Sequence, residues 1–235
     1  MVAAQAESPV VARHGVLLPH VAARLAARAP LRIIVLGSSS TEGAGATSPA
    51  ASYPSRLLVE LRTVLPADEA VTVLNRGIGG QDADDMARRV PAIIAEHPDL
   101  VIWQTGTNDA LRAMPLPHFV DLTQAGVRAM RDAGIDVMLM GPQLCKKLDG
   151  MKGSVQYRDA LVSMGAKLDA PMIDRFDMMR AWLANGQLTS DQMLSADGLH
   201  MTDGGYALLA REVSREILAD AGRGRAMAAM VRRQP

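Results

Sequence analysis

The chain has 235 residues and no net formal charge at pH 7, with 49% hydrophobic and 21% charged residues. This balance is ordinary for one globular domain, and it gives no global field that would attract nucleic acid or an anionic membrane surface. With only 3% aromatic residues and no apolar run near the ~20 residues of a membrane span, we expect no nucleic-acid partner and no membrane span.

Short apolar runs alternate with amphipathic stretches between residues 31 and 219. The first run, 33–36 (IIVL), is typical of a strand buried on both faces; Gly37 ends it, and three serines follow. Because strands and helices alternate, we expect an α/β fold whose parallel sheet is covered on both faces. The other strands are predicted at 71–74, 100–103, 137–140 and 171–173, and helices at 52–65, 82–96, 117–133, 154–168, 176–183 and 205–219.

The remaining segments suggest a simple domain organisation. Residues 1–30 are read as an Ala-rich N-terminal arm, with a short amphipathic helix over 20–29. Residues 31–221 form the single domain, and 222–235 are read as a basic C-terminal tail. In the same reading, Ser52 is a candidate cap for the helix that begins there, and 75–80 (NRGIGG) is a turn.

Four polar loops are expected at the same edge of the predicted sheet. The segments 38–40 (SSS), 77–80 (GIGG) and 106–109 (GTND) follow the first three strands, and 197–200 (DGLH) precedes the last helix. Ligands bind at the carboxyl edge of open α/β sheets, so these loops can converge. They contain what acyl transfer needs: a hydroxyl nucleophile, an imidazole base, a carboxylate to orient it, and donors for an oxyanion.

These loops also carry a family resemblance. The blocks LGSSSTEG (36–43), NRGIGG (75–80), GTND (106–109) and DGLH (197–200) resemble, in order and spacing, the four blocks of the SGNH hydrolases, also called GDSL esterases and lipases. The resemblance implies a three-layer α/β/α, flavodoxin-like, doubly wound sheet of about five parallel strands. It also implies that no cofactor is required.

The resemblance carries roles onto individual residues. It implies that Ser39 is the nucleophile, His200 the general base and Asp197 the carboxylate that orients it. The backbone N–H groups of Ser39 and Gly80 and the side chain of Asn108 would form the oxyanion hole. Glycine at position 80 would let its N–H approach the reacting centre without a side chain in the way.

One position departs from the family pattern. Between Gly37 and the nucleophile the family usually has Asp, and this chain has Ser38. Three adjacent hydroxyls result, so Ser38 and Ser40 remain alternative nucleophiles, although the block alignment favours Ser39. The departure also motivates the hypothesis of a binding protein that kept the pocket and lost the catalytic activity.

Other polar residues have simpler interpretations. We expect Asp109 to hold its loop together and Cys145 to be a passive, partly buried thiol. No metal site is expected, because the sequence has no HExxH motif, no cysteine pair and no second histidine near His200. Without the other blocks, Asp197 and His200 would be read as inert loop residues.

The function predicted from the sequence is a serine esterase acting on short-chain carboxylic esters, with O-acetyl groups on carbohydrate as one candidate. A short acyl group is expected because no long apolar insertion separates the blocks. The alternative is an acyltransferase that moves the acyl group to a sugar or alcohol on the same site. A cytoplasmic location is expected because no signal peptide is visible, with a periplasmic or secreted location as the alternative if a signal was removed. The sequence does not determine the oligomeric state.

Overall fold

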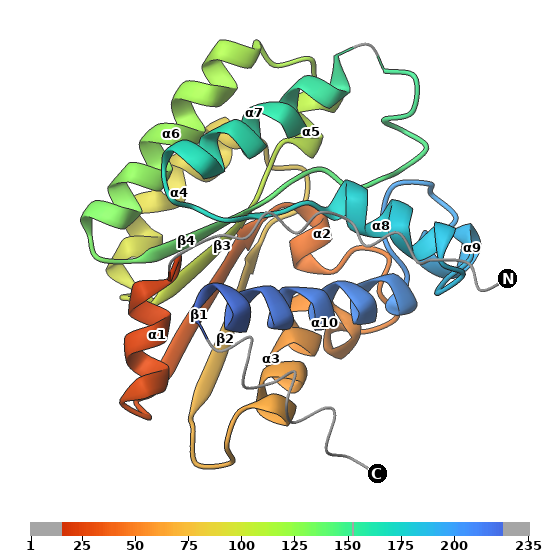
Figure 1. Cartoon of the computed structure of the whole chain (residues 1–235). Coiled ribbons are helices and arrows are strands. Elements are labelled where there is room, and N and C mark those ends of the chain that lie inside the picture. The colour runs from red at the N-terminus through yellow and green to blue at the C-terminus, as the bar shows by residue number, and fades with distance from the viewer. Residues whose placement is uncertain (1–15, 152, 223–235) are drawn as a thin grey trace, which may run out of the picture.

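The computed structural model describes residues 16–151 and 153–222, and a five-stranded parallel sheet lies at its centre (Figure 1). The strand order is β2-β1-β3-β4-β5, which is the flavodoxin-like order. The chain turns outward in opposite directions after β1 and after β3, so a crevice opens at the carboxyl ends of these two strands. The strands span Leu31–Gly37 (β1), Val71–Gly77 (β2), Leu100–Gln104 (β3), Asp136–Met140 (β4) and Met172–Ile173 (β5).

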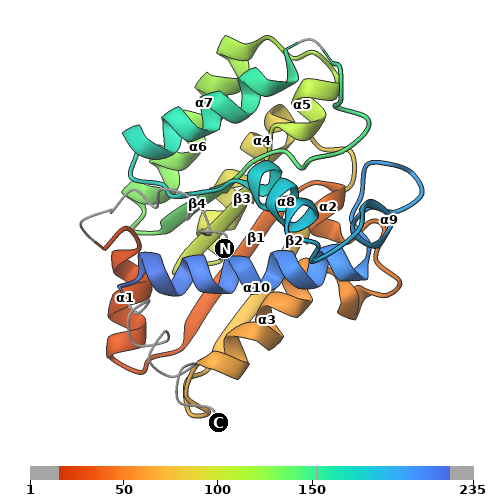
Figure 2. The same cartoon turned by 45° about the vertical axis from the view of Figure 1, so that its right-hand side comes forward.

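Helices cover both faces of the sheet, as Figures 1 and 2 show. Alternate residues of each strand point to opposite faces: Ile33 packs into one hydrophobic cluster and Ile34 into the other. Helices α1 (Pro19–Ala26), α3 (Tyr53–Val64), α8 (Arg175–Ala184) and α10 (Asp203–Asp220) contribute to the first cluster, and α4 (Ala83–Ala95), α6 (Leu116–Asp132) and α7 (Ser154–Lys167) to the second. Four short helical segments complete the described chain: α2 (Ser39–Glu42), η1 (Pro49–Ala51), α5 (Thr107–Leu111) and α9 (Ser190–Met193).

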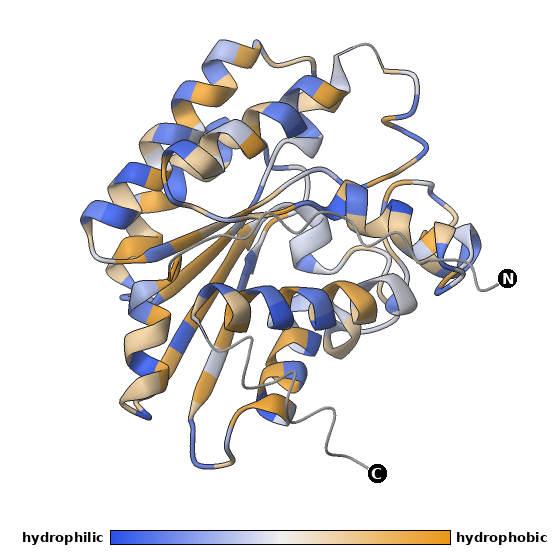
Figure 3. Ribbon diagram, in the orientation of Figure 1, coloured by the Kyte–Doolittle hydropathy of each residue, from blue (hydrophilic) through white to orange (hydrophobic). Residues whose placement is uncertain are grey.

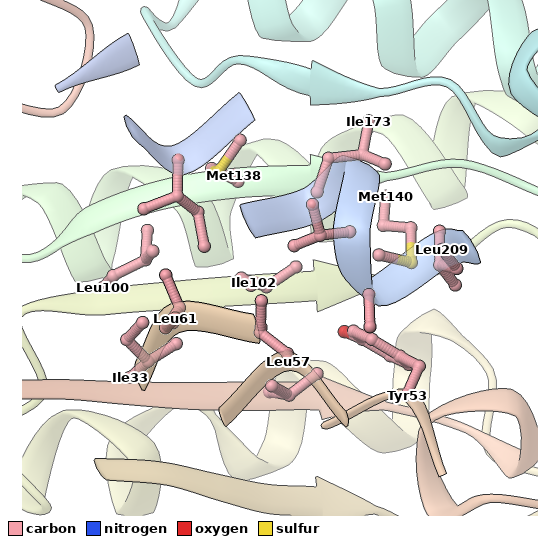
Figure 4. Packing of buried hydrophobic residues seen from close by; sticks show 14 of the residues in the cluster. Ile33, Tyr53, Leu57, Leu61, Leu100, Ile102, Met138, Met140, Ile173 and Leu209 are labelled. Carbon is pink, nitrogen blue, oxygen red and sulfur yellow. The ribbon is translucent and has the colours of Figure 1, made fainter. Parts of the chain in front are cut away.

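The first cluster shows how the sheet is anchored. In Figure 4, Ile33 and Ile102 of the sheet lie beside Leu57 and Leu61 of α3. All four side chains are fully buried. Each contributes about 1.5–3 kcal/mol on burial, so together they fix the helix against the sheet. Polar residues lie on the outer sides of the helices in Figure 3, as expected for helices that face the core on one side.

The predicted fold class is confirmed, and the differences concern element ends. The segment read as a turn at 75–80 begins as strand, because Asn75, Arg76 and Gly77 continue the parallel ladder opposite Val35–Gly37. The interpretation failed because β2 is an edge strand, whose polar residues can face outward. Ser52 precedes α3 but does not cap it with its side chain; its hydroxyl donates to the carbonyl of Pro49 (2.8 Å).

The N-terminal helix is joined to the opposite, amino edge of the sheet. Helix α1 was predicted at 20–29 and spans Pro19–Ala26, with Val21 and Leu25 buried. The backbone N–H of Val21 donates to Asp136 Oδ2 (2.9 Å). Residues 1–15 of the predicted arm and 223–235 of the basic tail lie outside the described residues, so the division into arm, domain and tail remains a prediction. Among the described helices, none is long and apolar enough to cross a membrane.

Candidate active site

The three serines form a tight turn at the carboxyl end of β1. Ser38 precedes α2, and Ser39 is the first residue of that helix. A Cβ on Gly37 would lie 2.1 Å from Thr41 Oγ1, so the turn closes only with glycine at this position. The backbone N–H of Ser39 belongs to the first helical turn, where N–H groups have no partner within the helix. It is therefore available as a donor beside the Ser39 hydroxyl.

A buried glutamine at the end of β3 fixes this turn. The Oε1 atom of Gln104 accepts from the Ser38 N–H (3.0 Å), the Ser38 hydroxyl (3.1 Å) and the Thr41 hydroxyl (3.2 Å). Ser38 is thus a donor at the position where the family usually has a carboxylate acceptor. Sequence analysis missed Gln104; the signal was a single polar residue closing the apolar run 100–104 (LVIWQ).

Ser39, His200 and Asp197 form a continuous hydrogen-bonded chain. His200 Nδ1 lies 2.5 Å from Asp197 Oδ2, and His200 Nε2 lies 2.8 Å from Ser39 Oγ. An ionised carboxylate can only accept, so Nδ1 carries the proton of the neutral imidazole and donates to Asp197. Nε2 is then the acceptor for the Ser39 hydroxyl. This arrangement can take a proton from the serine as its oxygen attacks an electrophile.

The second oxygen of Asp197 organises its own loop. Asp197 Oδ1 accepts from the Ser195 hydroxyl (2.8 Å) and from the backbone N–H groups of Leu199 (2.8 Å) and His200 (2.9 Å). Partial burial opposes ionisation, but these donors and the imidazole outweigh it and hold the pKa of Asp197 well below its ordinary value. Asp197 therefore stays ionised while it orients His200, although its side chain is 42% exposed.

A glycine-rich loop brings the base toward the nucleophile. Gly45 has φ +85°, and a Cβ there would lie 2.4 Å from the Met201 carbonyl and 3.0 Å from His200 Cβ. The loop after α2 therefore packs directly on the backbone that carries the imidazole. Ser39 and His200, 161 positions apart in the chain, meet because both loops lie at the same sheet edge (Figure 1).

The turn after β2 lies over the nucleophile. A Cβ on Gly79 would be 3.9 Å from Ser39 Cβ, so this backbone passes close to the serine. Gly80 has φ +78°, and a Cβ there would meet only the Arg112 guanidinium, at 4.0 Å. The reason for glycine at position 80 is therefore its left-handed backbone rather than crowding. Arg112 Nη2 donates to the Gly80 carbonyl (2.8 Å), which fixes the orientation of this turn.

Asn108 belongs to the first turn of α5 and joins this region from the end of β3. Its Nδ2 donates one hydrogen to the carbonyl of Gln81 (2.7 Å). An amide nitrogen has two hydrogens, so the second remains for a substrate oxygen. Of the predicted site residues, Ser39, His200 and Asp197 are in direct contact, whereas Gly80 and Asn108 flank them through the 80–81 turn.

Asp109 holds the loop, as expected. Its Oδ1 accepts from the Ala83 N–H (2.8 Å) and its Oδ2 from the Gly106 N–H (2.9 Å). Asp109 is completely buried, and this burial raises its pKa despite the two backbone donors. The carboxyl joins the start of α4 to the turn that presents Asn108.

The alternative nucleophiles have other surroundings. The Ser38 hydroxyl donates to Gln104, and Ser40 is buried, whereas half-buried Ser39 contacts the imidazole. Cys145 is also buried, and burial raises the pKa of its thiol. Within the described ranges, no group of three or more His, Cys, Asp or Glu side chains could hold a metal ion.

Comparisons with known proteins identify the family of this chain. A family model described as the non-GDSL lipase-like family matches residues 4–223. Among curated proteins, the chain is similar to an arylesterase from Vibrio mimicus, with 27% identity over 195 residues that cover 82% of this chain and 91% of the relative.

Solved structures share the fold. A two-domain esterase active on acetylated mannans has a TM-score of 0.74 and 21% identity; the match covers 88% of this chain and 53% of that esterase, so this chain spans about half its length. An acetylxylan esterase from Geobacillus stearothermophilus has a TM-score of 0.68 and 20% identity, with 80% of this chain and 94% of the relative covered. At these identities the likeness establishes the shared fold.

Proposed function

Because the chain belongs to the non-GDSL lipase-like family, we propose that it is a serine-dependent carboxylic ester hydrolase whose nucleophile is Ser39. One observation carries this proposal: the unbroken chain from the Ser39 hydroxyl through both nitrogens of His200 to Asp197. A hydroxyl in line with an imidazole and a carboxylate is the arrangement that acyl transfer needs.

The reaction follows from the hydrogen bonds. Ser39 Oγ attacks the ester carbonyl carbon while its proton moves to His200 Nε2. The imidazolium is stabilised by ionised Asp197. The carbonyl oxygen becomes an oxyanion, for which the N–H groups of Ser39 and Gly80 and the second amide hydrogen of Asn108 are the proposed donors. His200 then gives the proton to the departing alkoxide, which leaves an acyl-enzyme.

Water completes the cycle by the same steps, with water as the nucleophile and Ser39 as the leaving group. His200 takes a proton from water, the hydroxide attacks the acyl carbonyl, and Ser39 Oγ leaves with the proton returned by the imidazole. The exposure of the base loop supports hydrolysis over transfer to a second substrate, because the Asp197 side chain is 42% and the His200 side chain 16% exposed. Water can therefore approach the acyl-enzyme beside the imidazole of His200.

Short acyl esters, and acetyl groups on carbohydrate in particular, are the proposed substrates. The relatives support this choice: an arylesterase, an esterase active on acetylated mannans and an acetylxylan esterase share the family or the fold. A series of p-nitrophenyl esters tests the acyl length, with the largest kcat/KM expected for acetate or butyrate. A maximum at about ten carbons or more would contradict the short-acyl proposal.

The nucleophile is tested with p-nitrophenyl acetate and two serine variants. Ser39→Ala is expected to lower kcat by about 10⁴-fold to 10⁶-fold, because it removes the attacking atom. Ser38→Ala is the matched control: it removes an adjacent hydroxyl that contacts Gln104 and not His200, so most of the activity should remain. Full activity in Ser39→Ala would remove the proposed mechanism, and loss only in Ser38→Ala would move the nucleophile.

Transfer is measured in the same assay. With an alcohol or sugar added, the enzyme should release p-nitrophenol at the same rate as without it, and free acetate should remain the main product. A predominantly acylated acceptor would show instead that the chain is an acyltransferase.

A further inference from the structure

A fully buried arginine lies at the carboxyl edge beyond the triad and has no role in the proposed reaction. Arg175 is the first residue of α8, and its side chain has no exposed surface. Its Nε donates to the Gly141 carbonyl (2.7 Å), and its Nη2 donates to Gln143 Oε1 (2.8 Å). Its Nη1 has no hydrogen-bond partner among the described residues. A buried guanidinium bonded only to neutral oxygens is unfavourable for stability, so its presence calls for another explanation.

The partner of Arg175, Gln143, joins both functional loops. Gln143 Oε1 also accepts from the Thr107 hydroxyl (2.9 Å), and Thr107 immediately precedes Asn108. Gln143 Nε2 donates to the carbonyl of Leu199 (3.1 Å), and Leu199 immediately precedes His200. Gln143 and Thr107 are almost completely buried, so water does not replace these bonds easily.

The guanidinium of Arg175 and the carbonyl of Leu199 decide which way the Gln143 amide faces. A guanidinium can only donate, so the Gln143 atom that faces Arg175 must be Oε1, and the Thr107 hydroxyl then donates to the same oxygen. The nitrogen is then forced toward the Leu199 carbonyl. A flipped amide would place N–H groups against the guanidinium and an oxygen against the Leu199 carbonyl, which is unfavourable at both contacts.

The peptide that carries His200 is consequently fixed at both ends. Gln143 binds the Leu199 carbonyl, and Asp197 Oδ1 accepts from the His200 N–H on the other side of the same peptide plane (2.9 Å). Asp197 alone fixes one end of this plane and leaves its rotation open. The bond from Gln143 removes that freedom. Rotation of this peptide would otherwise move the imidazole of His200 away from Ser39.

From this geometry we propose that Gln143 is a positioning residue for His200 and for the loop of Asn108, and that buried Arg175 sets the orientation of the Gln143 amide. This inference rests on the proposed hydrolase function. Gln143 acts through the Leu199–His200 peptide and through Thr107, not on the reacting atoms. Removing it should therefore lower kcat and leave KM for a small ester nearly unchanged.

The sharpest test is Gln143→Glu. It keeps the shape of the side chain and an oxygen that accepts from both Arg175 and Thr107. A carboxylate there also pairs with Arg175, so we expect the thermal midpoint to be kept or raised. The second oxygen cannot donate to the Leu199 carbonyl, so kcat for p-nitrophenyl acetate should fall about 10-fold to 100-fold, with KM changed less than about threefold. Gln187→Glu, at an exposed position, is the matched control and should leave kcat unchanged.

A second pair of variants keeps the proposal testable if Gln143→Glu does not fold. Thr107→Val removes the hydroxyl that joins Gln143 Oε1 to the turn of Asn108, whereas Thr107→Ser retains it. We expect the valine variant to lose about threefold to tenfold in kcat and the serine variant to recover most of it. Equal kcat in the two variants, or wild-type kcat in folded Gln143→Glu, would overturn the positioning role.

Failure of the inference is distinguishable from failure of the proposed function. Ser39→Ala, measured alongside, reports on the mechanism itself. Loss of activity in Ser39→Ala together with full activity in Gln143→Glu rejects only the role of Gln143. Full activity in Ser39→Ala rejects the hydrolase mechanism, and the role of Gln143 with it.

Discussion

The two edges of the sheet hold similar residue types and differ in what these residues can do. At the carboxyl edge, His200 lies between a carboxylate and a hydroxyl. At the amino edge, a cavity of about 580 Å³ is lined by His20, His97 and Asp99, together with Arg24 and apolar residues. There the carboxylate of Asp99 accepts from Arg24 Nε (2.7 Å) and the Arg32 N–H (2.8 Å) and orients no imidazole. Histidines and carboxylates around a cavity are therefore not enough to make a catalytic site. The chemistry depends on their order in a hydrogen-bonded chain.

Backbone direction explains the difference. Parallel strands deliver successive loops to the carboxyl edge, where the segments after β1, β2 and β3 meet. At the amino edge the carboxylates join separate backbone segments instead: Asp136 of β4 accepts from the Val21 N–H of α1, and its burial raises its pKa. Asp197 has the opposite shift, a lowered pKa, because backbone and side-chain donors surround an exposed carboxylate. The same residue type is an anchor at one edge and a permanent anion at the other.

The largest expected effect separates these two carboxylates. Asp197→Asn should lower kcat about 10³-fold to 10⁴-fold, because a neutral amide neither selects the Nδ1–H tautomer nor stabilises the imidazolium. Asp136→Asn, at the amino edge, is the comparison and should leave kcat within about twofold of wild type, since it lies outside the triad. Steady-state hydrolysis of p-nitrophenyl acetate measures both. Equal losses in the two variants would show that the comparison between the edges is wrong.

A smaller loss is expected at the oxyanion donors. Asn108→Ala should lower kcat about 10²-fold to 10³-fold, because it removes the side-chain donor proposed for the tetrahedral intermediate. Asn185→Ala, at the exposed C-terminal cap of α8, is the matched control. Activity of Asn108→Ala at the wild-type level, with Ser39→Ala inactive, would mean that Asn108 only holds the Gln81 carbonyl.

Asp109 tests whether a carboxylate at the carboxyl edge can also be a pure anchor. Its two oxygens accept from two different N–H groups, and Asn has one accepting oxygen, so Asp109→Asn should lower the free energy of unfolding by about 1–3 kcal/mol. The raised pKa means that the folded state binds the Asp109 proton more tightly than the unfolded state. The stabilisation from this proton is complete below the unfolded pKa and is lost as pH rises through the folded pKa.

Urea unfolding of wild type and Asp109→Asn, at pH values from below the unfolded pKa to neutral, measures how Asp109 changes the free energy of unfolding. The stability difference between wild type and Asp109→Asn should be largest in acid and shrink toward neutral pH. A difference that grows as pH rises would mean that the folded state favours the ionised carboxylate, contrary to the burial of Asp109.

Much of the fold was predictable, because it follows from patterns within single segments. The run 33–36 and its four counterparts gave the parallel sheet, and the fold class and the lipase-like family are both confirmed. The short helices at 39–42 and 107–111 were not predicted, since four or five residues are too few to show a helical period. They form because tertiary contacts, such as those of Gln104 and Asp109, fix the turns that begin them.

The site was predictable only where motifs carried it. Ser39, Asp197 and His200 were proposed from their blocks, and the structure places them in contact; their roles stay a prediction until variants are assayed. Gln104 and Gln143 were missed, because a lone glutamine after an apolar run has no spacing signal. Their importance comes from buried hydrogen bonds between loops that lie far apart in the chain, which no local pattern encodes.

The smallest expected effect closes the comparison at the amino edge. The double substitution of His20 and His97 by alanine should leave kcat within about twofold of wild type, because neither imidazole lies at the carboxyl edge. The acid limb of the profile of kcat/KM against pH should also be unchanged, since that limb reports the base that accepts the nucleophile's proton. A shifted acid limb in this variant would mean that an amino-edge histidine couples to the reaction across the sheet. An unchanged limb means that neither amino-edge imidazole takes the nucleophile's proton, so the direction of the strands, rather than the size of the cavity, determines where the chemistry takes place.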